Sequence, residues 1–323
     1  MEDHERMKDA ALLRISNLNT MYGNSLILKG ISMSVGHGEI VGVVGESGSG
    51  KSTVIYSAMG LLGKGGRVAS GEIRYKTQDL LKISAEELRR LRGEKMTLIA
   101  QNPMDSFHPI RKIGKELRLF VKAHQTVSYP KAENEMLWLM EKFGLRDGRE
   151  ILGKYAFELS GGMCQRTAAA LAMVRKPEVL FADEPTSALD VTVQKQVVEE
   201  MLRVREEAGT SILIVSHNIG VISYMADKIY VMYAGSVVEY GSTREIVRYS
   251  AHPYTQNLIQ AVPKMNQPVF RAAGIAMRAR ESSGCPYVNH CPEKKKICEE
   301  QMPAFQKISD GHYVRCWQSG GGL

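Results

Sequence analysis

The sequence has no long apolar segment, and it has few cysteines before its C-terminal part. Its longest apolar runs, such as VLFA and SILIV, are much shorter than the roughly 18 residues that a membrane-spanning helix needs. The first ten residues, MEDHERMKDA, are charged and lack the apolar core of a secretory signal. We therefore expect a protein that neither spans a membrane nor is secreted, and whose thiols stay reduced.

Positive charge is present, but it is not concentrated. The 323 residues carry a formal net charge of +7 at pH 7, which would suit a polyanionic partner. The lysines and arginines are scattered, and no basic run alternates with aromatic residues, so we expect no nucleic-acid partner. Attraction to phosphates or to an anionic membrane surface stays open. The length predicts one large domain with an appended segment.

The strongest local signal is a glycine-rich segment between a predicted strand and a predicted helix. Residues 40–44, IVGVV, read as a buried strand. Residues 45–52, GESGSGKS, match G-x-x-x-x-G-K-[ST] at every fixed position, and a helical pattern follows. The glycines let backbone amides face phosphate oxygens, Lys51 can reach the outer phosphates, and Ser52 can bind Mg²⁺. An ordinary glycine-rich turn would not need this whole context, so we predict a nucleoside triphosphate site.

A second strand ends in two carboxylates. Residues 179–182 are apolar, and Asp183 and Glu184 follow directly. A carboxylate at a strand end beside a phosphate loop suits Mg²⁺, which favours Asp183 as a ligand. Glu184 points elsewhere on the pleat and can polarise a water for attack on the γ-phosphate. A solvated strand end is the plain alternative, which the preceding phosphate loop disfavours.

Between these two motifs lies LSGGMCQR, residues 159–166, before an alanine-rich helical run. Ser160 occupies the N-cap position of that helix. LSGGxxQR, with the phosphate loop before it and DEPTSALD after it, resembles the nucleotide-binding subunit of an ATP-binding-cassette (ABC) transporter. Gln101 matches this family's Q-loop, Asp190 ends its D-loop, and His217 matches its switch histidine.

The resemblance covers roughly residues 12–263 and implies an α/β fold. This fold is a P-loop NTPase cassette, with a RecA-like core, an antiparallel β subdomain and an inserted helical subdomain at about 102–160. ENEMLWLMEKFGL in the insertion has helical spacing. We expect residues 1–11 to be disordered and 264–323 to form a cysteine-containing C-terminal extension.

The resemblance also implies a set of site residues. Glu184, His217 and Gln101 would be catalytic, and Mg²⁺ would bind to Ser52, Gln101 and Asp183. The residues implied to bind ATP in the same subunit are Tyr22, whose ring would stack on adenine, and Gly45, Ser47, Gly48, Ser49, Gly50, Lys51, Ser52 and Thr53. The residues implied to face the ATP of a partner subunit are Ser160, Gly161, Gly162 and Gln165, with Asp190 in the D-loop. ATP would then lie in a head-to-tail dimer, and a monomer would hold an incomplete site.

Several positions depart from the family pattern or have an open role. Cys164 stands where arginine is common, Asn218 follows His217 where aspartate is usual, and Asn102 follows Gln101 where aspartate is common. None removes a catalytic group, and we interpret Cys164 as a small packing residue. Met104, Phe107 and His108 are candidates for receiving a helix of a membrane subunit, with a packed loop as the alternative.

Two stretches indicate the subfamily. QNPMDSFHP and HPYTQNLIQAVP resemble segments of the oligopeptide, dipeptide and nickel importers. The implied function is an ATPase that powers uptake of short peptides, with nickel or a metal chelate as the alternative cargo. The implied partners are a second, paralogous ATP-binding subunit, two transmembrane permeases and an extracytoplasmic substrate-binding protein. The implied location is the cytoplasmic face of the inner membrane, as a peripheral subunit.

Four of the five cysteines follow residue 284: Cys285, Cys291, Cys298 and Cys316. Disulfides are disfavoured in a reducing compartment. Zinc prefers close C-x2-4-C pairs, which are absent, whereas iron–sulfur clusters accept wider spacings. The segment also resembles the C-terminal part of peptide-importer ATPases, some of which carry such a cluster. We therefore favour a [4Fe–4S] cluster, with zinc and four unligated thiols as alternatives.

Two other classes of protein were weighed. Soluble ABC ATPases that act on ribosomes or in DNA repair carry two cassettes or a long coiled-coil insertion, and this chain has neither LSGG repeat nor heptad run. A structural cassette without hydrolysis is disfavoured because Lys51, Asp183, Glu184 and His217 are all present.

Overall fold

The computed structural model describes residues 11–124, 128–187, 189–261 and 284–318. The chain forms two compact units. Unit 1 comprises the chain up to Leu12, Val35–Glu39 and Lys82–Ile214, and unit 2 comprises Leu13–Ser34, Ile40–Leu81 and Val215–Leu323. The expected disordered N-terminus and the expected linker after Pro263 lie almost wholly outside the described residues.

Unit 2 contains an antiparallel sheet near the start of the chain. Its strand order is β2-β1-β4-β5. The strands are β1 Ala11–Tyr22, β2 Ser25–Gly36, β4 Gly66–Tyr75 and β5 Gln78–Asp79. β4 runs antiparallel to both β1 and β5, and buried side chains from β1 such as Leu13 and Ile15 form its core. The expected antiparallel β subdomain is therefore present.

A second, mixed group of strands in unit 2 has the order β11-β12-β10-β9-β3. The strands are β3 Ile40–Val44, β9 Lys228–Tyr233, β10 Ser236–Ser242, β11 Gln306–Ser309 and β12 His312–Val314. β3 pairs parallel to β9, and the other neighbouring pairs are antiparallel. The predicted strand 40–44 is confirmed, and all five of its residues are buried.

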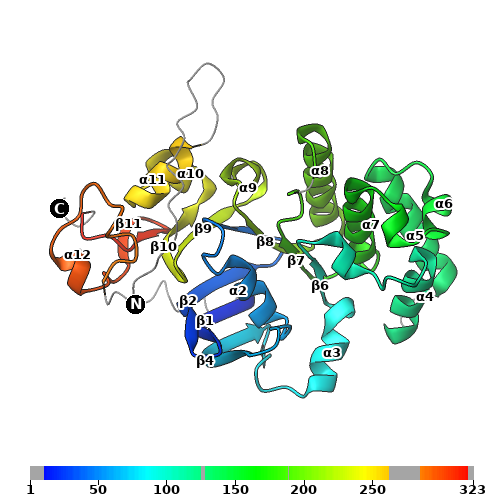
Figure 1. The fold of residues 1–323 in the computed structure, drawn as a ribbon, viewed down its shortest axis with the longest axis horizontal. Coiled ribbons are helices and arrows are strands. Elements are labelled where there is room, and N and C mark those ends of the chain that lie inside the picture. The colour runs from blue at the N-terminus through cyan, green and yellow to red at the C-terminus, as the bar shows by residue number, and fades with distance from the viewer. Residues whose placement is uncertain (1–10, 125–127, 188, 262–283, 319–323) are drawn as a thin grey trace. The chain divides into compact units, whose positions relative to one another are not determined.

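The helices of unit 2 are short. They are α2 Lys51–Ala58, α9 Ile219–Met225, α10 Thr243–Tyr249, α11 Pro253–Gln260 and α12 Ile297–Glu300. α9 packs so closely on β3 that a Cβ at Gly42 would lie 2.2 Å from a methyl carbon of Ile222. Figure 1 shows α10 and α11 beside β10, with α12 in the C-terminal segment.

In unit 1, three strands are neighbours in the order β8-β7-β6. They are β6 Met96–Ile99, β7 Val179–Asp183 and β8 Ser211–Ser216, which extends two residues beyond the unit. β6 and β7 are parallel, and every residue of β7 and β8 is buried. The predicted strand 179–182 is thus one residue longer and includes Asp183, and the predicted strand SILIVS is confirmed.

Helices make up most of unit 1. They are α3 Ala85–Glu94, α4 Ile113–His124, α5 Tyr129–Lys142, α6 Gly148–Leu152, α7 Gly161–Met173 and α8 Val191–Ala208, with 3-10 turns η1 Pro103–Ser106 and η2 Ala156–Glu158. Figure 1 shows α4 to α7 grouped together. The segment 102–160 is mostly helical, as expected, and α5 buries Met136, Leu139 and Met140 as its spacing predicts.

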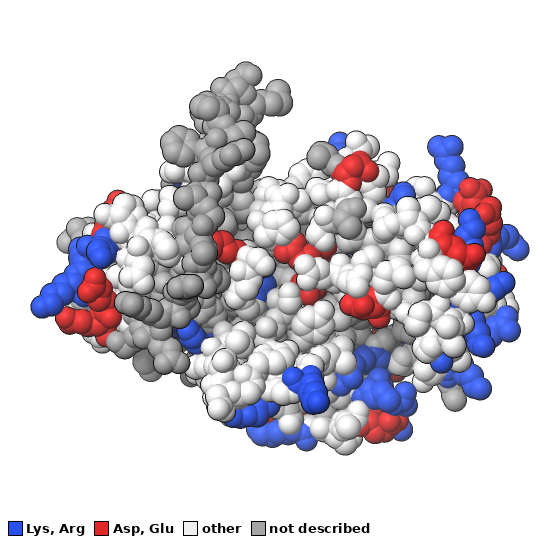
Figure 2. All heavy atoms as spheres, in the orientation of Figure 1, with Lys and Arg blue, Asp and Glu red and all other residues white. Residues whose placement is uncertain are grey.

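The surface matches the scattered charge of the sequence. On the face drawn in Figure 2, lysines and arginines lie in several separate groups with acidic residues among them. Within the described part of the chain, no helix is long and apolar enough to cross a membrane.

Candidate functional site

The phosphate-loop segment in unit 2 curls around the ammonium group of its own lysine. Lys51 Nζ donates hydrogen bonds to the carbonyl oxygens of Gly45 and Glu46, both at 2.8 Å. Gly48 and Gly50 have φ values of 80° and 95°, in the left-handed region that favours glycine. α2 begins directly afterwards. Such a loop turns consecutive amides inward and places a cation among them, which is the geometry that binds phosphates.

Close packing holds this loop in place. A Cβ at Gly45 would lie 2.1 Å from the carbonyl oxygen of Met232 in β9, so only glycine fits there. Gly235 N donates to the Ser49 carbonyl oxygen at 3.0 Å. The Ser49 hydroxyl is buried and has no hydrogen-bond partner among the described residues. The backbone of unit 2 therefore fixes the base of the loop.

The other predicted residues of unit 2 lie at its surface or are half-buried. Tyr22 ends β1 and is half-buried, and its ring atoms would lie 2.9 Å from a Cβ at Gly66. Ser47 is exposed, whereas Ser52 and Thr53 are half-buried in the first turn of α2. His217 is exposed, directly after β8.

In unit 1, the two carboxylates follow β7 as expected, and the backbone at Glu184 is strained. Asp183 ends the strand and is 1% exposed. Glu184 has φ 49°, an uncommon conformation for a side chain of this size, which costs on the order of 1–3 kcal/mol. The Glu184 carbonyl oxygen accepts hydrogen bonds from Ser187 N at 3.1 Å and Ser187 Oγ at 3.0 Å. These bonds offset the strain.

Helix α7, which begins within the LSGG motif and is here called the signature helix, contacts the same backbone. Gln165 on α7 is 1% exposed, and its Nε2 donates to the carbonyl oxygens of Glu184, at 3.4 Å, and Pro185. Ser160 caps the helix as predicted, because its Oγ accepts from Met163 N at 3.3 Å. Ser160 and Gly161 are exposed and Gly162 is half-buried, so the start of α7 is accessible at the surface of unit 1.

The bond from Gln165 to the Glu184 backbone was not predicted. The sequence pattern places Gln165 on a mostly apolar helix, but it does not show which backbone carbonyl groups the Gln165 side chain contacts. The signal that could have found it is a polar side chain within an alanine-rich run, because a buried amide needs a hydrogen-bond partner.

The remaining predicted residues of unit 1 lie around these helices. Gln101 is exposed after β6, and Asp190 is the N-cap of α8. Of the residues considered for contact with a membrane subunit, Met104 is 38% exposed, His108 is exposed and Phe107 is buried. Cys164 is buried, as expected of a packing residue, and its thiol contacts Met104 Sδ at 3.6 Å. Burial raises the pKa of Cys164 to about 11.

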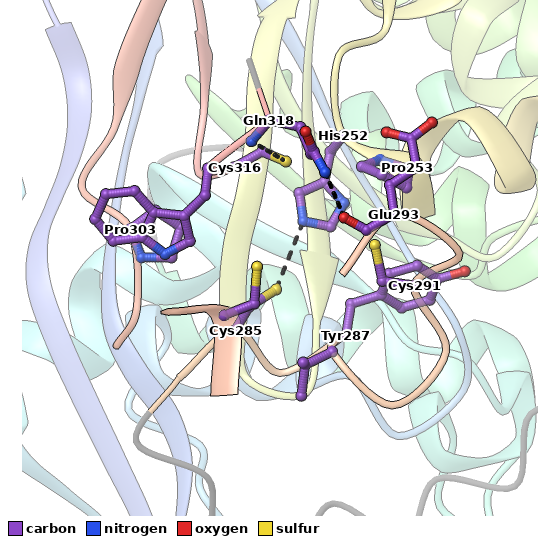
Figure 3. A pocket seen from close by; sticks show the side chains of 12 residues that line it. His252, Pro253, Cys285, Tyr287, Cys291, Glu293, Pro303, Cys316 and Gln318 are labelled. Carbon is purple, nitrogen blue, oxygen red and sulfur yellow. Dashed lines mark hydrogen bonds between the residues drawn. The ribbon is translucent and has the colours of Figure 1, made fainter. Parts of the chain in front are cut away.

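The four C-terminal cysteines are free thiols that line one small cavity in unit 2. Figure 3 shows the sulfur atoms of Cys285, Cys291 and Cys316 turned toward a common space. Other residues that line the cavity are Cys298, His252, Pro253, Tyr287, Glu293 and Trp317. His252 Nε2 lies 4.0 Å from Cys285 Sγ. The fold thus gathers cysteines that are up to 31 positions apart in the sequence (316 − 285).

Each of these sulfur atoms accepts a backbone hydrogen bond. The donors to Cys298 and Cys316 are the amides of Lys295 and Gln318, both at 3.4 Å. The donors to Cys285 and Cys291 are the amides of Tyr287 and Glu293. Burial raises the pKa of Cys285 to about 11 and also raises the pKa of Cys291. The amides of Tyr287 and Glu293 lower these two pKa values, and the neighbouring thiols raise them. Backbone donors to cysteine sulfur are what a metal-bound thiolate uses.

The arrangement does not suit a single metal ion. Zinc binds sulfur at about 2.3 Å, so four ligands around one ion must come within about 4 Å of each other. Among the described residues, no group of three or more His, Cys, Asp or Glu side chains is arranged to hold one ion. Four thiols with amide donors are the ligand type that an iron–sulfur cluster would use, and the cavity between them measures about 10 Å³.

Two family models match the chain. The first, described as "ABC transporter", matches residues 28–187, and the second, described as "Oligopeptide/dipeptide transporter, C-terminal region", matches residues 238–298. Among curated proteins, the dipeptide transport ATP-binding protein DppD of Bacillus subtilis is 35% identical over 315 residues, which is 95% of this chain and 94% of the relative. The DppD protein of Escherichia coli is 36% identical over 95% of this chain and 96% of its own. The oligopeptide transport ATP-binding protein OppD of Salmonella typhimurium is 33% identical over 95% and 93%.

Solved structures agree with this family. The ATP-binding subunit of an ABC transporter has a TM-score of 0.63 at 25% identity, covering 73% of this chain and 92% of that one. The cassette MJ0796, in a dimeric post-hydrolysis state bound to ADP and Pi, shares the fold with a TM-score of 0.63 at 24% identity, covering 72% and 99%. The relatives match along nearly the whole sequence, and the fold and the motifs agree with them. The chain therefore belongs to the ABC transporter family, as one of its ATP-hydrolysing cassettes.

Proposed function

We propose that this cassette powers the uptake of dipeptides or oligopeptides across the cytoplasmic membrane, as one subunit of a multi-subunit importer. The observation that carries the proposal is the identity of 33–36% to dipeptide and oligopeptide transport ATP-binding proteins, which spans 95% of this chain. The match of residues 238–298 to a peptide-transporter C-terminal region supports the same cargo. Nickel or a metal chelate is the alternative that the sequence left open.

Uptake of labelled dipeptide and of nickel, measured in cells that lack the gene, tests the cargo. We expect these cells to lose dipeptide uptake and to keep nickel uptake. The wild-type gene should restore dipeptide uptake, and the Lys51→Ala variant should not. The lysine variant controls for expression of an inactive cassette, because it loses the ammonium that the phosphate loop surrounds. Loss of nickel uptake with normal peptide uptake would contradict the peptide assignment.

The proposed roles in ATP binding follow from the chemistry of each side chain. The Lys51 ammonium would neutralise the outer phosphates, while the inward amides of the loop bind their oxygens. Tyr22 would stack on adenine. The proposed Mg²⁺ ligands are Ser52, Asp183 and Gln101, whose oxygens are the type that this ion prefers.

Glu184 is the proposed base for hydrolysis. Its carboxylate would orient a water and accept its proton as the water attacks the γ-phosphate, and His217 would contact that phosphate. We expect Glu184→Gln to abolish phosphate release while the protein still retains ATP, because the amide keeps the shape but cannot accept a proton. Phosphate release and the nucleotide bound after gel filtration are the measurements. Unchanged ATPase activity would rule out this role.

The complete site would require a second cassette. Ser160 and the backbone amides of Gly161 and Gly162 stand at the start of α7, where helix geometry favours a phosphate group from the partner's ATP. We propose a head-to-tail dimer with a paralogous subunit, bound to two permeases and supplied by an extracytoplasmic substrate-binding protein. The cassette would then sit at the cytoplasmic face of the membrane.

For the four cysteines we propose a [4Fe–4S] cluster. The support is one cavity lined by four thiols, each with a backbone amide donor. When bound, the cluster would supply a covalent tie between the segments that carry its cysteines. Zinc and free thiols remain the alternatives.

Spectroscopy on anaerobically purified full-length protein decides between these. We expect broad absorbance at about 400 nm and about four iron atoms per chain. Stoichiometric zinc without this absorbance, or neither metal, would refute the cluster.

As domain boundaries we propose 12–263 for the cassette, about 102–160 for its helical subdomain and 264–323 for the extension.

A further inference from the structure

A tyrosine from the C-terminal part of the chain holds the phosphate loop. Glu46 N, the second amide of the loop, donates a hydrogen bond to the Tyr254 hydroxyl at 2.9 Å, across 208 positions in the sequence. Tyr254 lies in α11 and is 2% exposed. This amide leads directly into the curl around Lys51, because the Glu46 carbonyl oxygen accepts from Lys51 Nζ.

Tyr254 is itself held from several sides. Its ring packs edge-on against Tyr233, with centroids 4.7 Å apart, and lies 5.4 Å from the ring of Tyr287. Its backbone amide donates to Nδ1 of His252, the N-cap of α11, at 3.1 Å. A buried aromatic ring with this many neighbours has little rotational freedom, so its hydroxyl oxygen is fixed opposite the loop.

The cysteine segment forms part of this support. Tyr287 lies two residues after Cys285, is 1% exposed, and accepts a hydrogen bond from Asn257 Nδ2 of α11 at 2.7 Å. From the same segment, His290 interacts electrostatically with the Glu46 carboxyl group, as does Lys51. The loop and the cysteine segment thus share Tyr254 as a common neighbour.

We propose that Tyr254 is a positioning residue for ATP binding, because its hydroxyl fixes the start of the phosphate loop. It does not touch the reacting atoms. Its hydrogen bond pre-organises the loop in the shape that ATP requires, so its loss lowers affinity for the substrate and for the transition state alike. The inference rests on the proposed phosphate-binding role of residues 45–52.

The test is Tyr254→Phe in the assembled transporter, with steady-state ATPase kinetics. We expect the KM for ATP to rise about threefold to tenfold, the effect of one lost hydrogen bond, with kcat within about twofold of wild type. The matched control is Tyr233→Phe, which removes a hydroxyl from the same aromatic cluster; within the described residues that hydroxyl makes no hydrogen bond to the loop. Its KM should equal that of wild type.

Hydrogen exchange gives a second reading that general destabilisation would not reproduce. In Tyr254→Phe, faster exchange is expected in the peptide that contains Glu46 but not in the rest of unit 2. Lys51→Ala separates the two hypotheses: if it still binds ATP normally, the phosphate-loop role fails. If Lys51→Ala loses ATP but Tyr254→Phe keeps the wild-type KM, whatever its melting temperature, the positioning role is overturned.

Discussion

At the scale of single residues, the unusual feature is the backbone of Glu184. The proposed base sits at φ 49°, in a region that a glutamate rarely occupies. Its peptide group is held through Ser187 and through Gln165, the last of which belongs to the signature helix. A conformation of this kind persists only where neighbouring groups hold it in place. Gln165 therefore connects the helix that would face a partner's ATP to the backbone of the residue that would activate water.

We predict that Gln165→Met lowers kcat about tenfold, with the KM for ATP within about twofold. Methionine has a similar length but cannot donate to the two carbonyl groups, so the Glu184 backbone loses support worth about 1.4 kcal/mol. Steady-state ATPase kinetics on the assembled transporter provide the measurement. Met173→Leu, at a buried position on the same helix, is the control for packing changes and should behave as wild type. Equal kcat values for Gln165→Met and wild type would show that the bonds do not matter for turnover.

The sequence identified Glu184 but not its conformation. The motif reports which residue types follow one another, and the short apolar run before Asp183 predicts a buried strand. A positive φ depends on what holds the next peptide group, and one of those partners, Gln165, lies 19 positions before Glu184 in the chain. The hydrogen bond of Tyr254 escaped prediction for the same reason, although its residue was visible in HPYTQNLIQAVP.

At the scale of elements, one predicted site residue has a second, structural role. Asp190, placed in the D-loop by its motif, is also the N-cap of α8, and its Oδ1 accepts from Thr192 N and Val193 N at 3.1 Å each. The amides of the first helical turn lack partners within the helix, so this carboxylate satisfies two of them. An effect of Asp190 substitution on ATPase activity thus has two possible sources.

We predict that two substitutions at Asp190 separate these sources. Asp190→Ala should lower the free energy of unfolding by about 1 kcal/mol, because alanine cannot cap the helix. Asp190→Asn keeps a side-chain oxygen at the N-cap and should unfold like wild type, while losing the negative charge. Urea denaturation measures the first effect, and ATPase kinetics on Asp190→Asn report the charge alone. Equal stability of the alanine variant and wild type would contradict the capping role.

The elements themselves followed from local patterns where those patterns were strong. Strand 40–44, strand SILIVS and the N-cap at Ser160 were predicted correctly, because burial and capping are decided by neighbouring residues. The short strands β11 and β12 were not predicted. QKIS and HYV have no distinctive period, and β12 becomes a strand through pairing with β10, more than 70 positions earlier.

At the scale of the whole molecule, a buried carboxylate joins the distant parts of unit 2. Glu239 on β10 is 0% exposed and accepts hydrogen bonds from Ala251 N at 2.7 Å, His252 N at 3.1 Å and His312 Nε2 at 2.8 Å. One side chain therefore fixes both the start of α11, which carries Tyr254, and the C-terminal strand β12. Four of the cysteines lie in the segment between α11 and the end of the described chain.

We predict that Glu239→Ala lowers the free energy of unfolding by about 3 kcal/mol or more, because three donors, two of them buried, lose their buried acceptor. The control is Glu299→Ala, an exposed carboxylate in an ion pair with Lys294 at 3.4 Å, which should change stability by less than about 0.5 kcal/mol. Urea denaturation of the full-length protein compares the two variants.

Because Glu239 anchors the helix that holds Tyr254, the KM for ATP of Glu239→Ala should also rise at temperatures where the variant is folded. A variant as stable as Glu299→Ala, with the wild-type KM, would show that this carboxylate does not connect the C-terminal segment to the phosphate loop.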